Sequence, residues 1–170
     1  AEGYPLEALR EERDLHMDMT REAGRRSDAH LVRYLEASRF VRPGDSVLDV
    51  ACGLGYGLNS LAQASRAAEL LGVDESAYAV DYASVAFRAP PGIKMEFRRG
   101  DAENLSFVET SSIDFMVSVE TLEHLYHPEK LLAEAYRVLR PGGRLYVSVP
   151  NLWADETGND PNPFHHHVYD

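Results

Sequence analysis

The sequence predicts a single α/β domain with a mostly parallel sheet and helices on both faces. Its 170 residues, 44% of them hydrophobic, suffice for one well-buried core and are too few for two domains of ordinary size. Five apolar runs typical of buried strands alternate with stretches whose apolar residues recur at helical spacing. Strands that alternate with helices favour a parallel sheet covered on both sides.

The other elements can be placed around the stretch Val47–Gly57, which reads VLDVACGLGYG. Residues 47–51 have the composition of a buried strand, three alternate glycines follow, and Leu58, Leu61 and Ala62 continue at helical spacing. Glycines in such a loop allow a tight turn and let a ligand approach the main chain, while the following helix offers free N–H groups. This order predicts a site for a nucleotide-type cofactor.

The spacing of the glycines separates two classes of cofactor. A dinucleotide-binding loop has the pattern G-x-G-x-x-G, and counting from Gly53 and Gly55 its third glycine would stand at position 58, which is Leu58. The pattern present is D-x-A-x-G-x-G-x-G, with Asp49 at the end of the strand. An acid there suits a cofactor with a cationic amino-acid end and would repel a pyrophosphate.

This pattern resembles motif I of the class I S-adenosylmethionine-dependent methyltransferases. The resemblance implies a three-layer Rossmann-like fold with S-adenosylmethionine as methyl donor. It assigns cofactor contacts to Asp49, Ala51, Gly53 and Gly55, although the family usually has glycine where this chain has Ala51. The Ala51 side chain should narrow the loop slightly. The neighbouring Cys52 is interpreted as a packing residue rather than a catalytic thiol.

Composition narrows the range of partners and locations. The net charge of −11 would repel a nucleic-acid backbone over most of the surface, so nucleic acid is not expected as a partner. No apolar run reaches the roughly 18 residues of a membrane span, and the first residues lack the order of a signal peptide. The single cysteine permits no internal disulfide, which agrees with a reducing cytoplasm.

Two helices are predicted before the first strand, and residues 1–45 are expected to form an N-terminal flank or lid. Residues 5–22 are charged and amphipathic, and a second helix is predicted from Ser27, as its N-cap, to Phe40. In the resembling family such helices cover the cofactor and help to shape the acceptor pocket. Packing roles are favoured for the four candidates for that wall, which are Tyr4, His16, His30 and Tyr34.

Residues 46–151 are expected to form the cofactor-binding core, in which acids follow successive strands. The second strand, predicted at residues 68–74, ends in Asp74, which stands 21 residues after Gly53. In a βαβ unit a carboxylate at that point lies beside the ribose of the cofactor and can accept hydrogen bonds from its hydroxyls. Asp74 is therefore the candidate for ribose binding.

A helix from residue 76 to about 88 and a third strand at residues 93–97 are predicted next, followed by Gly100–Asp101–Ala102. The last three residues also resemble the methyltransferase pattern. The resemblance implies that Asp101 binds the adenine amino group and that Ala102 offers its backbone N–H to the ring.

The fourth strand is predicted at residues 112–119, and the motif ExxEHL follows its carboxyl end, where ligands bind in open parallel sheets. A helix that begins at Pro128 and a fifth strand at residues 144–149 complete the core. The resemblance thus extends in order from Val47 to Asn151. More narrowly, ACGxGYG, ExxEHL, RVLRPGG and NPFH resemble a bacterial subgroup associated with cell-surface glycan or natural-product pathways.

The resemblance implies methyl transfer to a small-molecule acceptor, with a hydroxyl or amine of a sugar or secondary metabolite as the expected nucleophile. Alignment of that nucleophile with the reactive S–CH₃ bond can alone contribute about 7–11 kcal/mol. A base helps to deprotonate a hydroxyl, and histidine has a suitable ordinary pKa of about 6.5. His124 and His165 are the candidates, and His165 belongs to residues 152–170, which are predicted to form a loop towards the acceptor. Glu120 is a candidate partner of a histidine or a contact to the methionine end of the cofactor.

Two alternatives remain beside metal-free methyl transfer. Glu120, Glu123 and His124 would share one face of a helix, with a late histidine as a further ligand, and this pattern resembles plant small-RNA 3′-end methyltransferases that use a divalent ion. We nevertheless expect no metal, because metal-free relatives also carry E-x-x-E-H. The other alternative is a non-catalytic module that binds S-adenosylmethionine and has lost its acceptor site.

The predicted sheet is shorter than that of the resembling family. A seven-stranded sheet with the order 3-2-1-4-5-7-6 is expected, and only five strands can be found, so the C-terminal strands are apparently missing. Residues 144–149 would then form an apolar edge strand, which invites pairing with another chain. A homodimer or another chain covering this edge is one expectation, and further residues beyond Asp170 are the other.

Overall fold

The computed structural model describes residues 19–21, 24–151, 162 and 164–169. Most of the helix predicted at residues 5–22 lies outside this part, but Met19–Arg21 form a turn rather than the end of a helix. The first described helix, α2, spans Arg25–Ser38. It begins earlier than predicted, because its N-cap is Gly24 and not Ser27.

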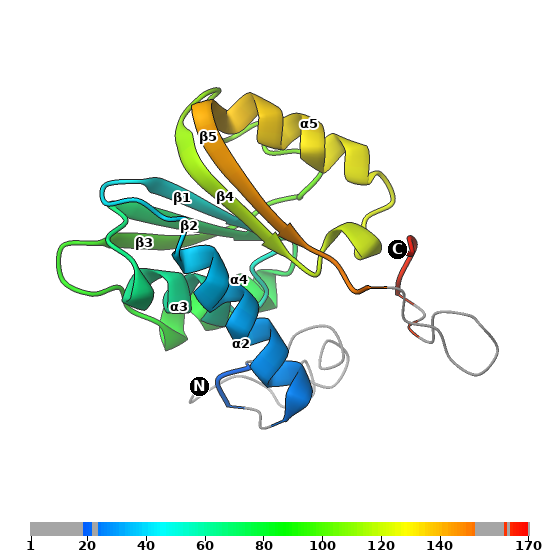
Figure 1. Cartoon of the computed structure of the whole chain (residues 1–170), viewed down its shortest axis with the longest axis horizontal. Coiled ribbons are helices and arrows are strands. Elements are labelled where there is room, and N and C mark those ends of the chain that lie inside the picture. Colours follow the sequence, from blue (N-terminus) through cyan, green and yellow to red (C-terminus); the bar gives the residue numbers. More distant parts are fainter. Residues whose placement is uncertain (1–18, 22–23, 152–161, 163, 170) are drawn as a thin grey trace.

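The remaining elements alternate as predicted, and their bounds are β1 Ser46–Val50, α3 Tyr56–Ala64, β2 Glu69–Asp74, α4 Ala77–Ala86, β3 Lys94–Arg99, β4 Ile113–Val119, the 3₁₀ turn η1 Leu122–His124, α5 Pro128–Val138 and β5 Leu139–Ser148. The five strands form one sheet in the order β3-β2-β1-β4-β5, and every pair is parallel. Figure 1 shows α2, α3 and α4 on one side of this sheet and α5 on the other. This is the α/β architecture that the sequence predicts.

Local sequence explains where the helices begin. The Ser76 hydroxyl accepts a hydrogen bond from the backbone N–H of Ala79 at 3.1 Å, which makes Ser76 the cap of a helix that was predicted to begin at this residue. Pro128 occupies the first turn of α5, where its missing N–H costs no helical hydrogen bond. The buried residues of α5, which are Leu131, Ala135 and Val138, follow the spacing of one helical face.

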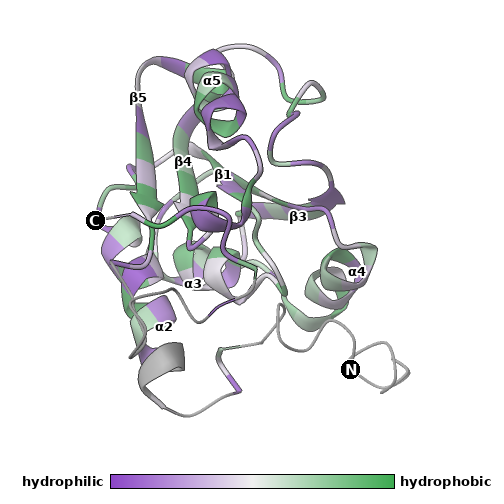
Figure 2. Ribbon diagram, turned by 90° about the vertical axis from the view of Figure 1, so that its right-hand side faces the viewer, coloured by the Kyte–Doolittle hydropathy of each residue, from purple (hydrophilic) through white to green (hydrophobic). Residues whose placement is uncertain are grey.

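Two apolar clusters fill the two sides of the sheet. On one side, Tyr34 of α2 and Leu58 of α3 pack on Val47 and Phe115. On the other side, residues of α5 and of the loop before β4 pack on Leu48 and Met116. In Figure 2 the interior strand β4 is mainly hydrophobic, whereas the edge strand β3 is mainly hydrophilic. This contrast is expected, since charged residues on an edge strand hinder pairing with another chain.

The fifth strand departs from its predicted limits. It was expected at residues 144–149, but β5 is continuous from Leu139, and a bulge of the strand accommodates residues 140–143. Along β4 only Asp114 separates the partners of Leu139 and Arg144, which are Ile113 and Phe115. Gly142 makes this irregularity possible because its φ of 81° is strained for residues with a side chain.

Candidate active site

The strand order reverses between β1 and β4, and in open α/β sheets the carboxyl ends of the strands at such a reversal form a crevice. After β1 the chain moves outward through β2 and β3, and it then returns to the opposite side of β1 as β4. Ligands of open α/β sheets bind at such a point of reversal. Asp49 of β1 pairs with Val117 of β4, so the glycine loop and the segment after β4 both begin at this crevice.

The glycine loop adopts a series of left-handed backbone conformations. Ala51, Gly53 and Gly55 have φ values of 59°, 52° and 80°, so the strand ends at Val50, one residue earlier than predicted. A Cβ on Gly55 would lie 2.6 Å from Cβ of Ala83 and within 3 Å of the Phe97 ring. Glycine at this position therefore allows both the turn and the close approach of α4.

Asp74 links the end of β2 to the glycine loop. Its Oδ2 accepts a hydrogen bond from the Gly53 N–H at 2.8 Å, and its Oδ1 accepts one from the Ser76 N–H at 2.9 Å. Each carboxylate oxygen has two lone pairs and can accept more than one hydrogen bond, which the role at a ribose requires. The geometry is compatible with the predicted role of Asp74 and adds a second one, which is to hold the loop.

Asp49 is completely buried below the loop. Its Oδ1 accepts a hydrogen bond from the Tyr34 hydroxyl at 3.3 Å, and its Oδ2 has no hydrogen-bond partner among the described residues. Burial raises the pKa of Asp49 well above its ordinary value, the Tyr34 hydrogen bond lowers it, and the nearby Asp74 raises it further. Because Asp49 lies beside the loop with acceptor capacity left, it is a suitable counter-ion for a cationic group.

Tyr34 reaches Asp49 because residue 57 has no side chain. A Cβ on Gly57 would lie 2.1 Å from the Tyr34 ring, so the ring packs directly on the backbone of α3. The sequence favoured packing for Tyr34 and did not predict its hydrogen bond to Asp49. The third glycine of ACGLGYG was the available signal, since it had no cofactor role assigned to it.

The adenine candidates follow β3, as predicted. Asp101 is exposed and its Oδ1 accepts a hydrogen bond from the Glu103 N–H at 2.7 Å, and Ala102 is half-buried. Glu103 in turn accepts a hydrogen bond from the His127 N–H at 2.8 Å, and Lys130 lies 3.3 Å from its other oxygen. The loop that carries the adenine candidates is thus fastened to the start of α5.

Glu120 begins the segment after β4 with an unusual backbone. Its φ of 52° is rare for a residue with a long side chain. Its N–H donates to the Ser148 carbonyl at 2.9 Å, its Oε1 accepts from the Ser148 hydroxyl at 3.0 Å, and Arg33 of α2 lies 3.4 Å from the same oxygen. Glu120 therefore joins β4, β5 and α2, and sequence reasoning missed its ion pair with Arg33.

The predicted helical face of Glu120, Glu123 and His124 is wrong. Only Leu122–His124 form a turn of 3₁₀ helix, and the left-handed backbone of Glu120 directs its side chain to Ser148. Glu123 and His124 instead meet His165, and the ligand atoms of the three side chains all lie within 4.8 Å of one another. The two candidate bases, His124 and His165, are therefore neighbours, with ring centres 4.7 Å apart.

A family model described as a methyltransferase domain matches residues 48–147. This range contains the glycine loop, the strand-end acids and the segment after β4. The chain belongs to the class I S-adenosylmethionine-dependent methyltransferases.

Relatives of this methyltransferase chain share its core. It is 36% identical over 124 residues to a probable S-adenosylmethionine-dependent methyltransferase of Mycolicibacterium smegmatis, covering 72% of this chain and 45% of the relative. It is 34% identical over 113 residues to a ubiquinone biosynthesis O-methyltransferase of Hahella chejuensis, covering 66% of this chain and 46% of the relative. The chain thus spans less than half the length of these curated relatives.

A solved structure agrees with the fold. The complex between the Haloferax volcanii Trm112 methyltransferase activator and a putative methyltransferase matches with a TM-score of 0.64 and 30% identity, covering 72% of this chain and 53% of that chain. In the described part of the chain, no helix is long and apolar enough to cross a membrane.

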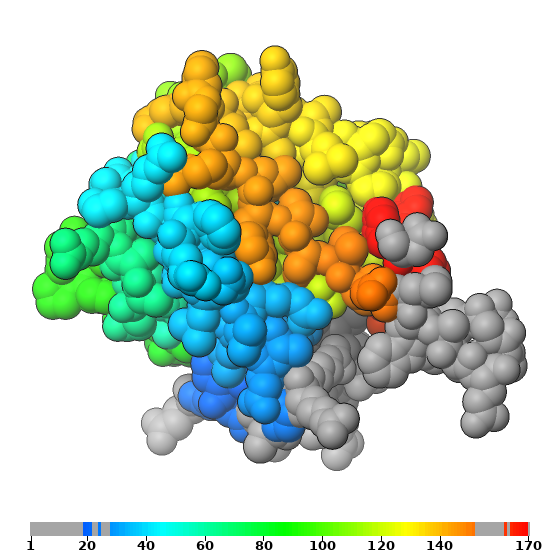
Figure 3. Space-filling model, in the orientation of Figure 1, coloured from blue at the N-terminus to red at the C-terminus, as the bar shows by residue number. Residues whose placement is uncertain are grey.

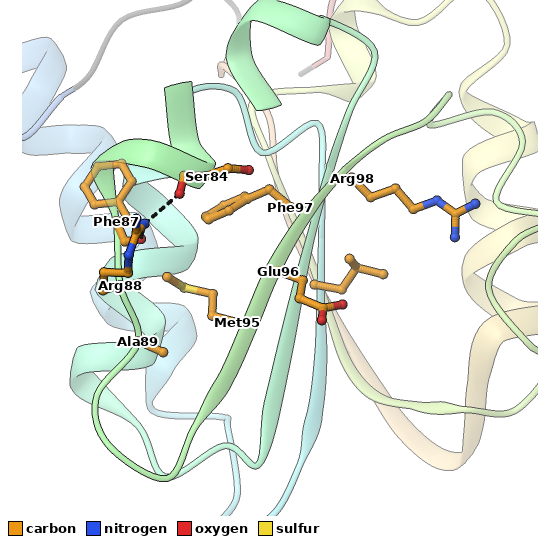
Figure 4. Close-up of a pocket in the computed structure, with 9 residues that line it drawn as sticks. Ser84, Phe87, Arg88, Ala89, Met95, Glu96, Phe97 and Arg98 are labelled. Carbon is orange, nitrogen blue, oxygen red and sulfur yellow. Dashed lines mark hydrogen bonds between the residues drawn. The ribbon is translucent and has the colours of Figure 1, made fainter. Parts of the chain in front are cut away.

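One cavity lies away from the crevice of this methyltransferase core. It has a volume of about 590 Å³ and opens between the C-terminal end of α4 and the edge strand β3. Figure 4 shows Phe87 and Arg88 on the helix side, with Met95 and Phe97 of β3 facing them. Arg88 donates to the Ser84 carbonyl at 2.6 Å, which closes the helix end rather than the cavity. None of the predicted site residues lines it.

Proposed function

We propose that this chain is the cofactor-binding core of an enzyme that transfers a methyl group from S-adenosylmethionine to a small molecule. The observation that carries the proposal is the arrangement of strand-end acids around the glycine loop. Asp49 is buried with acceptor capacity beside the loop, and Asp74 fixes the loop through Gly53. An amino-acid end with a positive charge and a ribose suit these two carboxylates.

Each candidate contact has a place in the crevice. We assign the methionine end to Asp49, Ala51 and Glu120, the ribose to Asp74, and the adenine to Asp101 and Ala102, with the N–H groups of Gly53 and Gly55 lining the loop. All of these residues lie at the carboxyl ends of β1 to β4, or just after them. Residues 46–151 would form the core, residues 1–45 a flank over it, and residues 152–170 the approach of the acceptor.

The acceptor that we propose is a hydroxyl of a sugar or secondary metabolite, with an amine as the alternative nucleophile. The similarity to an O-methyltransferase supports a hydroxyl. His124 and His165 support it as well, because a hydroxyl has to lose a proton during the transfer and neutral imidazole accepts one near neutral pH. Either ring is a candidate base. Separately, we expect the enzyme to act in the cytoplasm.

No metal is required for this reaction. The sulfonium methyl is already electrophilic, so catalysis rests on alignment of the acceptor and on proton removal. We therefore expect activity to persist after treatment with a chelator such as EDTA. Loss of activity in EDTA, restored by a divalent ion and abolished by Glu123→Gln, would contradict metal-free transfer.

Calorimetry on this chain tests cofactor binding. S-adenosylhomocysteine should bind and NAD should not. Asp74→Ala should lower the affinity for S-adenosylhomocysteine at least about tenfold, because it removes both the proposed ribose contact and the hydrogen bond that holds Gly53. Glu96→Ala, on the exposed side of β3, is the matched control and should bind like the unaltered chain. Tight NAD binding with no response to S-adenosylhomocysteine would overturn the proposal.

Methyl transfer is measured on the complete protein against hydroxylated metabolites. Replacement of the base, by His124→Gln or His165→Gln, should lower kcat by about 10²–10⁴ with little change in KM for the cofactor. Unchanged kcat in the double variant would rule out a histidine base. Cofactor binding without turnover of any acceptor would contradict transfer and favour the non-catalytic module.

A further inference from the structure

Glu123, His124 and His165 form a compact group of metal-ligating side chains from two distant parts of the chain. Glu123 and His124 belong to η1, and His165 lies 41 residues after His124. The carboxylate of Glu123 is 1% exposed, and one ligand atom from each of the three residues lies within 4.8 Å of the others. In Figure 1 the described part of the C-terminal segment lies beside the turn that follows β4.

Backbone contacts, and not the imidazoles alone, bring the two segments together. The N–H groups of His166 and His167 donate to the Glu123 carbonyl at 2.7 and 3.3 Å. The His166 ring also stacks on Tyr126, with ring centres 4.1 Å apart. The approach of His165 to Glu123 and His124 is therefore built into the path of the chain.

Hydrogen bonds indicate which nitrogen of each ring carries a lone pair. Nδ1 of His124 lies 3.0 Å from the Phe164 carbonyl, which can only accept, so Nδ1 carries a proton and in the neutral ring the lone pair is on Nε2. Nε2 of His124 faces a Glu123 oxygen at 3.8 Å. A hydrogen bond from the other ring nitrogen to a carbonyl is the usual support of a metal-binding histidine.

His165 has its lone pair on the same atom. Its Nε2 lies 2.8 Å from the amide nitrogen of Asn162, which only donates, so Nε2 accepts this hydrogen bond. A cation bound at Nε2 would take the place of the amide hydrogen. In their neutral forms both rings thus present Nε2 to a shared ion.

We propose that Glu123, His124 and His165 bind a divalent transition-metal ion of the zinc class, which fastens the segment around His165 to η1. Two imidazoles and one carboxylate are a common ligand set for zinc and leave a fourth position open. Bonds of about 2.0–2.2 Å place tetrahedral ligand atoms about 3.3 Å apart. The three ligand atoms must therefore close by at most about 1.5 Å, which side-chain rotation of the two histidines can supply.

This site goes beyond the proposed methyl transfer and acts against it. An ion that uses both Nε2 atoms leaves neither His124 nor His165 able to accept a proton from the acceptor. Zinc should therefore inhibit an enzyme that needs no metal, and a chelator should restore the rate.

Cobalt(II) titration tests the site without reference to activity, because Co²⁺ in a four-coordinate protein site absorbs visible light far more strongly than the hydrated ion. We expect one equivalent to give such a band and Zn²⁺ to abolish it. Glu123→Gln and His165→Gln should each weaken binding at least about tenfold, since loss even of an outer contact to a metal ligand costs that much. His127→Gln, which replaces an exposed histidine outside the ligand set, is the matched control.

Glu123→Gln also distinguishes metal binding at the proposed site from metal binding by the three consecutive histidines alone. Residues 165–167 alone could hold a metal without any help from Glu123, so unchanged affinity in this variant would overturn the proposal, as would the absence of a cobalt band in the unaltered chain. Circular dichroism verifies the fold of each variant. If Glu123→Gln does not fold, His124→Gln, whose side chain is 33% exposed, takes its place in the same comparison.

Discussion

Single residues in the glycine loop combine two demands, a left-handed backbone and close packing. Gly55 satisfies both, whereas Ala51 has a φ of 59° with a side chain present. A left-handed conformation costs a residue with a Cβ about 1–2 kcal/mol, so Ala51 stores strain beside the proposed cofactor site.

Ala51→Gly should raise the free energy of unfolding by about 0.5–1 kcal/mol. Glycine removes the backbone strain of about 1–2 kcal/mol. It also raises the entropy of the unfolded chain, which lowers stability by about 0.4–1 kcal/mol, so the net effect is stabilising. Urea denaturation monitored by circular dichroism measures the difference. Ala133→Gly, at an exposed position in the middle of helix α5, is the control and should lower stability by about 0.5–1 kcal/mol. A loss of stability in both variants would show that Ala51 is not strained.

Asp49 should make the stability of the ligand-free chain depend on pH. Its pKa in the folded state lies above the ordinary value, mainly because of burial, so the folded chain holds this proton more tightly than the unfolded chain. The stabilising contribution of protonated Asp49 is fully present below its pKa in the unfolded chain, which is about 4. This contribution is lost as pH rises through the pKa of Asp49 in the folded chain, at no more than about 1.4 kcal/mol per pH unit. Denaturation curves at several pH values should show this decline, and Asp49→Asn should remove it. An equal decline in the variant would assign it to other groups.

At the scale of elements, α5 carries the loop of the adenine candidates. Glu134 accepts a hydrogen bond from the Leu105 N–H at 2.7 Å. Arg137 donates to the carbonyls of Leu105 and Val108, both at 2.8 Å, and pairs with Glu134 at 2.8 Å. The pair lowers the pKa of Glu134, so its carboxylate stays charged at neutral pH. One helix therefore fixes the loop between β3 and β4.

Arg137→Met should lower the free energy of unfolding by about 2–3 kcal/mol. It keeps most of the aliphatic side chain but removes the hydrogen bonds to both loop carbonyls, each worth about 1.5–3 kcal/mol before solvent exposure reduces it, together with the partly exposed ion pair to Glu134. Affinity for S-adenosylhomocysteine should fall as well, because the loop loses its anchor. Lys94→Met, in an exposed ion pair with Glu96, should change neither quantity by much. An effect of Arg137→Met no larger than that of the control would contradict the anchoring role.

The elements were predictable where a local pattern determines them. Alternating apolar runs, the start of a helix near Ser76 and Pro128 in a first turn all depend on neighbours in the sequence, and the structure confirms them. The helical face of Glu120 and Glu123 failed because the chain after β4 turns left-handed before it can form a helix. Long-range contacts carry no local signal, so the sequence could suggest a late histidine beside Glu123 and His124 but could not show which one, and it wrongly added Glu120.

At the scale of the whole molecule, the described sheet ends at β5, which pairs only with β4. Around this edge lie exposed apolar side chains of two elements, including Phe40 after α2 and Leu145 of β5 itself. The Phe40 ring lies 6.3 Å from that of Tyr146 on β5, whereas Leu145, the preceding residue of the strand, points to the opposite face. A parallel strand with free backbone groups and apolar neighbours favours pairing with a second chain.

This chain on its own should therefore associate through β5. We expect sedimentation velocity to show a dimer whose share grows with concentration, and Leu145→Lys should weaken dimerisation at least about tenfold, because a desolvated charge costs more than the 1.4 kcal/mol that this factor represents. Val85→Lys, at a position of α4 that is 59% exposed, is the control and should leave association unchanged. Hydrogen exchange adds an independent reading, since the outward amides of residues 144–148 should gain protection as the dimer forms. A monomer at every concentration, with these amides strongly protected, would show instead that the chain covers this edge itself.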